Sequence, residues 1–172
     1  MLRGSSTAPS LQFSEAMFSF PNPVNEKAAR VVAGVVALAG VVVLVTGARW
    51  LLIPLAYGFW ARVLTGPTLS PLGRLASGVI APRLGPPRYV AGPPKRFAQG
   101  MGAAITTLAA ALGLGFGATG AADVFIGALV VAATLESAFA LCLGCQVFGL
   151  LVRAGLVPRE TCERCANIWS RA

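Results

Sequence analysis

The stretch "AARVVAGVVALAGVVVLVT", residues 28–46, decides how the rest of this chain is interpreted. Its only charged residue is Arg30, close to its first end. An α-helix rises about 1.5 Å per residue, so such a segment reaches roughly 28 Å, close to the thickness of the hydrocarbon core of a bilayer. The stretch therefore predicts a first transmembrane helix, TM1, over residues 28–46.

The composition of the whole chain agrees with membrane insertion. The 172 residues are 56% hydrophobic and 12% charged, whereas soluble domains carry about 25% charged residues. The net charge of +8 fits the excess of Lys and Arg in the cytoplasmic loops of membrane proteins. Nucleic-acid binding is not indicated, because the sequence has no basic patch interleaved with aromatic residues. The chain has no His, which excludes His metal ligands and Ser-His-Asp triads within it.

Three further apolar segments extend the pattern to an all-α integral membrane bundle of four transmembrane helices. TM2 is expected over residues 48–64, although Pro54 leaves a re-entrant hairpin as an alternative, and TM3 is expected over residues 98–118. TM4, over residues 121–152, is longer than a bilayer core, so we expect it to tilt or to project from the membrane.

A short interfacial helix is expected over residues 70–82, between TM2 and TM3. Ser70 suits the cap of this helix and Pro71 its first position. The predicted organisation is therefore a flexible N-terminal arm (1–22), a membrane domain (23–153) and a tail (154–172). Stripes of small residues on TM1 and TM3 predict close helix packing and a possible homo-oligomer; they comprise Ala29, Ala33, Ala37, Gly113 and Gly117.

The distribution of Lys and Arg predicts an orientation. Four spans place both termini on one side, together with 13 of the 14 Lys and Arg residues, and leave Arg49 alone on the other. Because basic residues collect on the cytoplasmic side, both termini are expected to be cytoplasmic.

Four cysteines form two Cys-x-x-Cys pairs. Cys142 and Cys145 fall in TM4, about 12–17 Å inside its cytoplasmic end by helical rise, whereas Cys162 and Cys165 fall in the tail. Disulfides are disfavoured in a reducing cytoplasm, so such pairs are more often catalytic or metal-binding. Arginines near the tail pair favour its thiolate form. The spacing between the pairs also fits a four-cysteine zinc site, which is the alternative interpretation for all four residues.

Glu136 is the acid deepest within a predicted span. A carboxylate there requires a partner or a cavity, and Arg49 and Arg62, at either end of TM2, are the candidate partners. On one continuous helix, Cys142 is about 120° and Cys145 about 180° around the axis from Glu136. Direct contact between Glu136 and the thiols is therefore not expected, although Glu136 stays a candidate proton acceptor for a thiol.

Several segments together resemble a known bacterial membrane family, that of domain of unknown function 4395. They are "PVNEKAARVVAG" (23–34), "SPLGRLA" (70–76), "PPKRFAQGMG" (93–102) and "ESAFALCLGC" (136–145). The resemblance implies a small multi-span protein of the bacterial plasma (inner) membrane, with thioredoxin-like or sulfurtransferase neighbours. It also implies that Glu136, Cys142 and Cys145 are motif positions.

The leading functional hypothesis is a membrane thiol–disulfide or persulfide relay. Cys162 and Cys165 would exchange electrons or sulfane sulfur with Cys142 and Cys145 through a mixed disulfide or persulfide. A soluble thioredoxin-like or sulfurtransferase protein would be the partner, with no cofactor required. The alternatives are a membrane protein with a structural zinc site, and a non-catalytic membrane scaffold or small permease.

Overall fold

The computed structural model describes residues 20–158 and is built almost entirely from helices. The main helices are α2 (Glu26–Thr46), α3 (Leu52–Thr65), α6 (Gly92–Ala110), α7 (Thr119–Phe139) and α8 (Leu143–Arg153). Shorter helical pieces are η1 (Arg49–Leu51), α4 (Pro71–Leu75), η2 (Ala76–Ile80), α5 (Ala81–Arg83) and η3 (Ala111–Gly115). Two short strands, β1 (Val24–Asn25) and β2 (Tyr89–Val90), pair antiparallel.

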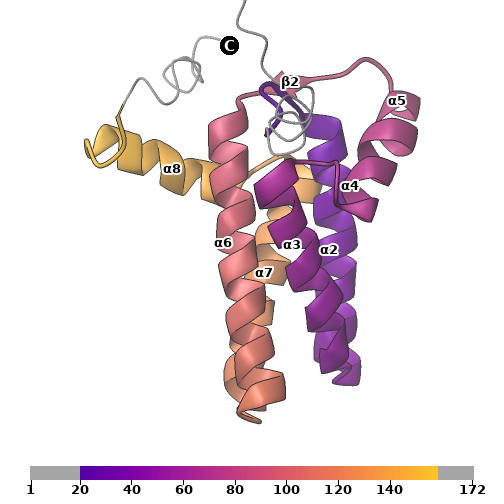
Figure 1. Ribbon diagram of the computed structural model, residues 1–172, viewed down its shortest axis with the longest axis vertical. Coiled ribbons are helices and arrows are strands. Elements are labelled where there is room, and N and C mark those ends of the chain that lie inside the picture. The colour runs from indigo at the N-terminus through magenta and orange to yellow at the C-terminus, as the bar shows by residue number, and fades with distance from the viewer. Residues whose placement is uncertain (1–19, 159–172) are drawn as a thin grey trace, which may run out of the picture.

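Four helices run along the long axis of the molecule and form two hairpins, α2–α3 and α6–α7. The hairpins pack against each other, with α2 along α7 and α3 along α6. The turns α2–α3 and α6–α7 lie at one end of the bundle, at the bottom of Figure 1, which we call the turn end. The other end carries α4, α5, the two strands and the start of α8, and we call it the entry end because the chain enters α2 there (Figure 1).

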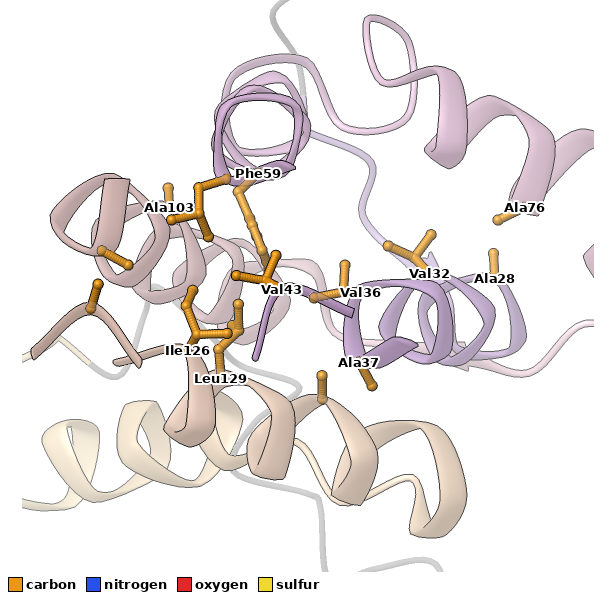
Figure 2. Packing of buried hydrophobic residues seen from close by; sticks show 14 of the residues in the cluster. Ala28, Val32, Val36, Ala37, Val43, Phe59, Ala76, Ala103, Ile126 and Leu129 are labelled. Atoms are coloured by element: carbon orange, nitrogen blue, oxygen red, sulfur yellow. The ribbon is translucent and has the colours of Figure 1, made fainter. Parts of the chain in front are cut away.

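The core of the bundle consists mainly of small and β-branched side chains. Val36, Val43 and Ile126 are almost completely buried between α2, α7 and their neighbours (Figure 2). Small residues allow close approach of helices: a Cβ on Gly40 would lie 2.5 Å from Val130 Cγ2 of α7. The helices therefore pack through complementary small and branched residues, while many large apolar side chains, such as Leu38 and Val131, stay exposed on the outside.

Three helical segments are long and apolar enough to cross a membrane: Glu26–Thr46, Gly92–Gly115 and Thr119–Phe139. The first confirms a helix where TM1 was predicted, and Gly47 (φ 69°) ends it in the left-handed conformation. The second begins six residues before predicted TM3 and continues from α6 through η3. Predicted TM2 is helical as η1 and α3, but it is too short to count among these three segments.

The segment 70–82 is helical as predicted and continues to Arg83 through α4, η2 and α5. The Ser70 hydroxyl accepts a hydrogen bond from the Gly73 amide at 3.1 Å, which is the expected cap. The side chains of Ala76 and Ala81 are buried against the rest of the bundle, and this run packs beside α2. It therefore contributes to the core in addition to covering the entry end.

The prediction of one continuous TM4 over residues 121–152 was wrong. The helix ends at Phe139, Ala140 takes the left-handed conformation (φ 58°), and a separate helix, α8, begins at Leu143. α8 does not continue the direction of α7 but leads away from the bundle (Figure 1). A C-terminal cap of this kind normally selects glycine, so the alanine in this sequence gave no sign of the break.

Candidate functional site

The break after α7 is stabilised by hydrogen bonds to the last carbonyl groups of that helix. The amide of Ala140 donates to Glu136 O at 3.1 Å. Arg30 of α2 donates from Nε to Ser137 O and from a terminal nitrogen to Ala138 O, both at 3.0 Å. A cation at a helix C-terminus is favourable because the unpaired carbonyls there carry partial negative charge. Arg30 thus fixes the place where α7 ends.

The first cysteine pair occupies the start of α8. Cys142 is the N-cap residue, with extended backbone (φ −86°, ψ 102°), and Cys145 is the third helical residue. The carbonyl oxygen of Cys142 accepts the first bond of the helix, from the Gln146 amide at 3.1 Å. Cys142 is only 7% exposed, whereas Cys145 is half-buried. A helix N-terminus favours negative charge, and therefore favours a thiolate at Cys142.

This placement corrects the prediction that both thiols lie deep inside a spanning helix. Because the chain turns at Ala140, Cys142 and Cys145 lie at the entry end of the bundle. The same turn removes the premise that Glu136 and the cysteines share one helix axis. Glu136 acts on both thiols electrostatically, while its direct hydrogen bond is with Lys95.

α8 is held against α6 by close packing next to the thiols. A Cβ on Gly144 would lie 2.5 Å from the Cβ of Ala98 and 2.6 Å from its Cα, so only glycine fits between the two helices. The rings of Phe97 and Phe148 pack at 5.5 Å between centroids, a distance typical of favourable aromatic pairs. These contacts fix the first turn of α8, and with it the cysteine pair, on the surface of α6.

A buried ion pair lies beside the cysteines. Lys95 Nζ of α6 lies 2.5 Å from Glu136 Oε1 of α7, with side-chain exposures of 8% and 15%. The sequence pointed to Arg49 and Arg62 as partners of Glu136. Arg49 instead pairs with Asp123, at 3.1 Å, which makes that assignment wrong. Arg62 has an electrostatic interaction with Glu136, but its hydrogen bonds go to Gln99 and Ser70.

Sequence reasoning missed Lys95 as the direct partner of Glu136. The signal available was its position: Lys95 lies in the "PPKRFAQGMG" segment, just as Glu136 lies in "ESAFALCLGC". The segments were recognised separately, but helix periodicity could not pair residues of different helices.

The pKa values of the two thiols are shifted in opposite directions. A hydrogen bond from the Cys145 thiol, together with attraction to Lys95, holds the pKa of Cys142 below its ordinary value, although burial and Glu136 oppose the shift. The same hydrogen bond raises the pKa of Cys145, and burial and the charge on Cys142 raise it further. Deprotonation is therefore favoured at Cys142 over Cys145, and a thiolate at Cys142 accepts a hydrogen bond from the protonated Cys145 thiol. The more acidic thiol belongs to the residue with the smaller exposed fraction.

Cys162 and Cys165 lie outside the described residues, and so does the rest of the tail from residue 159. Within residues 20–158, no group of three or more Cys, His, Asp or Glu side chains is arranged to hold a metal ion. A four-cysteine zinc site needs the tail pair, so that alternative stays a prediction.

Comparison with known proteins identifies one relevant family. The family model described as Domain of unknown function (DUF4395) matches residues 24–153, which covers every described helix. This match confirms the family indicated by the four resembling segments. No curated protein matches the chain, and no solved structure matches it either.

Proposed function

The chain belongs to the DUF4395 family, and from that premise we propose that it is a membrane thiol–disulfide relay that works with a soluble thioredoxin-like or sulfurtransferase protein. One observation carries the proposal: Cys142, whose thiol has the lowered pKa, is buried at a helix N-terminus near Lys95, while its partner Cys145 is the more exposed residue. Two cysteines that served only for packing would not need one thiol of lowered pKa and a second, more exposed residue beside it.

The location that fits this function is the bacterial plasma membrane, with the entry end in the cytoplasm. Three helical segments are long enough to span, and α3, preceded by η1, would complete a bundle of four. Of the ten Lys and Arg residues between positions 20 and 158, only Arg49 belongs to the turn end. Basic residues collect on the cytoplasmic side, which favours a cytoplasmic cysteine pair with α4–α5 and α8 near the membrane surface.

The exchange step follows from the acidities of the two thiols. In the oxidised pair, an incoming thiolate attacks the accessible Cys145 sulfur, the Cys142–Cys145 bond breaks, and Cys142 leaves as a thiolate. A thiol of low pKa leaves faster, and the helix N-terminus and Lys95 stabilise it. The second thiol of the donor then attacks the mixed disulfide and transfers its proton to Cys145 as that sulfur leaves. The donor dithiol is oxidised to a disulfide, and the Cys142/Cys145 pair is reduced.

The tail pair is the other dithiol in the sequence of the chain itself. Arg153 ends α8, and Cys162 follows nine residues later, a length that reaches about 30 Å when extended. Exchange between the two pairs is reversible, so a soluble dithiol protein could reduce Cys162/Cys165 and thereby Cys142/Cys145, or accept electrons from them. Sulfane sulfur would pass by a different step in the reduced pair: the Cys145 thiolate attacks the outer sulfur of a donor persulfide, the donor S–S bond breaks, and the donor leaves as a thiolate while Cys145 becomes the persulfide.

Trapping the mixed disulfide tests the proposal. In full-length protein in its native membrane, Cys142→Ala leaves Cys145 to attack the oxidised disulfide of its partner, and the mixed disulfide that forms can no longer be released by back-attack from Cys142. We expect non-reducing peptide mapping to find Cys145 joined to Cys162 or Cys165. After Cys162→Ser and Cys165→Ser, we expect it to be joined to a soluble thiol protein. The matched variant Cys145→Ala, which retains only the buried sulfur, should trap severalfold less.

Three outcomes would count against this proposal. Equal trapping by Cys142→Ala and Cys145→Ala would remove the assignment of Cys145 as the attacked sulfur. Stoichiometric zinc in the intact protein, with unfolding on chelation, would favour the structural zinc site instead. Full cellular function in a variant that lacks all four cysteines would leave the scaffold or permease interpretation.

A further inference from the structure

One side of helix α8 is apolar and exposed. Leu143, Val147 and Leu150 are spaced four and three residues apart, so they lie on the same side of the helix. All three side chains are exposed, and Leu150 is exposed by 61%. α8 leads away from the bundle (Figure 1), so contact with the other described helices does not account for these residues. We call this surface of Leu143, Val147 and Leu150 the apolar side of α8.

The sulfur that we assign to exchange lies on a different side of the same helix. At about 100° of rotation per residue, Cys145 is about 140–160° away from each residue of the apolar side. Gly149 follows Cys145 one turn later, and a Cβ there would meet nothing within 4 Å. We call the surface of Cys145 and Gly149 the cysteine side. Between the two sides, Gly144 and Phe148 pack against α6.

The contact with α6 indicates which way each side of α8 points. Gly144 packs on Ala98 of α6, and Lys95 lies about one turn nearer to the entry end, where α6 begins. Lys95 acts electrostatically on Cys145, so the cysteine side faces the entry end. The apolar side, on the other flank of the contact, therefore faces the turn end, along the outer surface of the bundle.

That outer surface is the one that a spanning bundle presents to lipid. Phe139 and Leu141, exposed by 74% and 40%, connect the outside of α7 with the apolar side of α8. Because α7 is long and apolar enough to cross a membrane, the apolar surface continues from a span onto α8. Arg153 is exposed at the end of α8, where a cation reaches lipid phosphate while the helix lies flat. Apolar continuity and charge thus both indicate the bilayer as the occupant.

We propose that the apolar side of α8 is embedded in the surface of the bilayer that the bundle spans, with Cys145 turned away from the lipid toward the water. A helix of this kind lies in the interface with its apolar face at the headgroup boundary. The inference rests on the proposed membrane location, and it narrows the partner of the proposed relay to a water-soluble thiol protein. Thiols or oxidants dissolved in the lipid would meet Leu143, Val147 and Leu150 instead of the Cys145 sulfur.

Spin labels on single cysteines test which side of α8 lies in lipid. The protein is the full-length chain with its four cysteines changed to serine, in vesicles of phosphatidylglycerol and phosphatidylcholine. One label site is introduced in each variant: Leu150→Cys on the apolar side, Gly149→Cys on the cysteine side, or Leu38→Cys on the exposed outside of α2. Oxygen is apolar and concentrates in the hydrocarbon, whereas a nickel–ethylenediaminediacetate complex stays in the water.

We expect the label at Leu150→Cys to resemble that at Leu38→Cys, with oxygen relaxing the spin severalfold more than the nickel complex does. At Gly149→Cys, one residue away, the nickel complex should be the more effective of the two. Leu38→Cys separates two kinds of failure. If its label is in water, the membrane location fails, and the inference with it. If its label is in lipid but the label at Leu150→Cys is in water, the location stands and the assignment of α8 fails.

Alkylation of the native thiols is a second measurement, which needs no cysteine-free chain. In membranes, the reaction with a charged, water-soluble maleimide is compared with that of a lipid-soluble one by peptide mapping. The ratio of the two rates should be severalfold higher at Cys145 than at the added thiol of Leu150→Cys. An equal ratio at the two thiols would overturn the proposal.

Other occupants of the apolar side give distinct results with the spin labels. A label at Leu150→Cys that neither oxygen nor the nickel complex reaches is covered by protein, and this outcome would also overturn the proposal. Dipolar broadening between labels would then identify a second copy of the chain as the cover, and its absence would identify another segment of the same chain.

Discussion

The two ends of the bundle each carry an ion pair between helices, and the two pairs differ in how exposed their side chains are and in what lies next to them. At the turn end, Arg49 and Asp123 lie 3.1 Å apart with side-chain exposures of 22% and 40%. At the entry end, Lys95 and Glu136 lie 2.5 Å apart with exposures of 8% and 15%. The partly exposed pair joins two chain segments near a turn. The buried pair adjoins two thiols whose acidities it affects.

The difference shows that the desolvation cost of a buried ion pair falls at the entry end of the bundle. Exposed pairs contribute little to stability because water screens them and ordering them costs entropy. Buried pairs carry a desolvation cost that often exceeds their attraction. A protein that needed only to hold its helices together would use apolar residues at Lys95 and Glu136, so the buried pair is the better indicator of function.

The largest effect is expected from breaking the buried pair. Lys95→Met leaves the Glu136 carboxylate without its close counter-ion and should lower the free energy of unfolding by about 3–5 kcal/mol. Reversible unfolding in mixed micelles measures it. The double variant Lys95→Met/Glu136→Leu removes both charges and should recover most of the loss. A double variant as unstable as Lys95→Met would show that the loss of stability does not come from the unpaired charge on Glu136.

A smaller effect is expected where α8 meets α6. Gly144→Ala places a methyl group within 2.5 Å of Ala98, and overpacking of this kind costs about 1–3 kcal/mol. The matched control is Gly149→Ala on the same helix, where a Cβ meets nothing within 4 Å; this change should be neutral or slightly stabilising. Thermal unfolding of the two variants side by side compares them, and equal losses would contradict the close packing.

The influence of the buried pair on Cys142 predicts a pH dependence. Because the pKa of Cys142 is lowered in the folded protein, its rate of alkylation should rise at lower pH than in the denatured chain, where a free thiol titrates near 8.5. Lys95→Gln removes a charge that favours the thiolate and should move the rise to higher pH. Alkylation with iodoacetamide, followed peptide by peptide, measures both. A profile that Lys95→Gln does not move would leave Lys95 without an electrostatic role.

The smallest effect is expected at the turn end. Arg49→Gln breaks the exposed pair with Asp123 and should cost about 0.2–1 kcal/mol. It should leave the alkylation profile of Cys142 unchanged, because Arg49 does not act on either thiol. A loss as large as that of Lys95→Met would erase the distinction between the two ends.

The sequence predicted most of the helices but not the arrangement at the site. Apolar length predicted spans over 28–46, 98–118 and 121–152, and the structure has long apolar helices over 26–46, 92–115 and 119–139. Ser70 and Pro71 predicted the start of the helical run that begins at Pro71. The segment 121–152 was read as one helix because apolar character continues across Ala140 and no proline or glycine marks that residue. The contacts that end α7, from Arg30 to Ser137 O and Ala138 O, come from 107 and 108 residues away in the chain.

The same limit applies to the site residues. Cys142, Cys145 and Glu136 were recognised from their types and spacing, whereas Lys95 was not, because it belongs to a different helix. Helical periodicity relates residues on one axis only. Once the axis bends, the angles it predicts between Glu136 and the cysteines no longer apply.

By itself, the sequence determined that this chain forms long apolar helices and that one end of the molecule is strongly basic. It also determined that two thiols stand three residues apart. These properties follow from local hydrogen bonding, side-chain hydrophobicity and charge, which each segment carries alone. Only the tertiary structure decided that α7 stops at Phe139, that Cys142 becomes a helix N-cap, and that Lys95 meets Glu136 beside it. Those outcomes depend on contacts between segments distant in the chain, which no segment specifies without its neighbours.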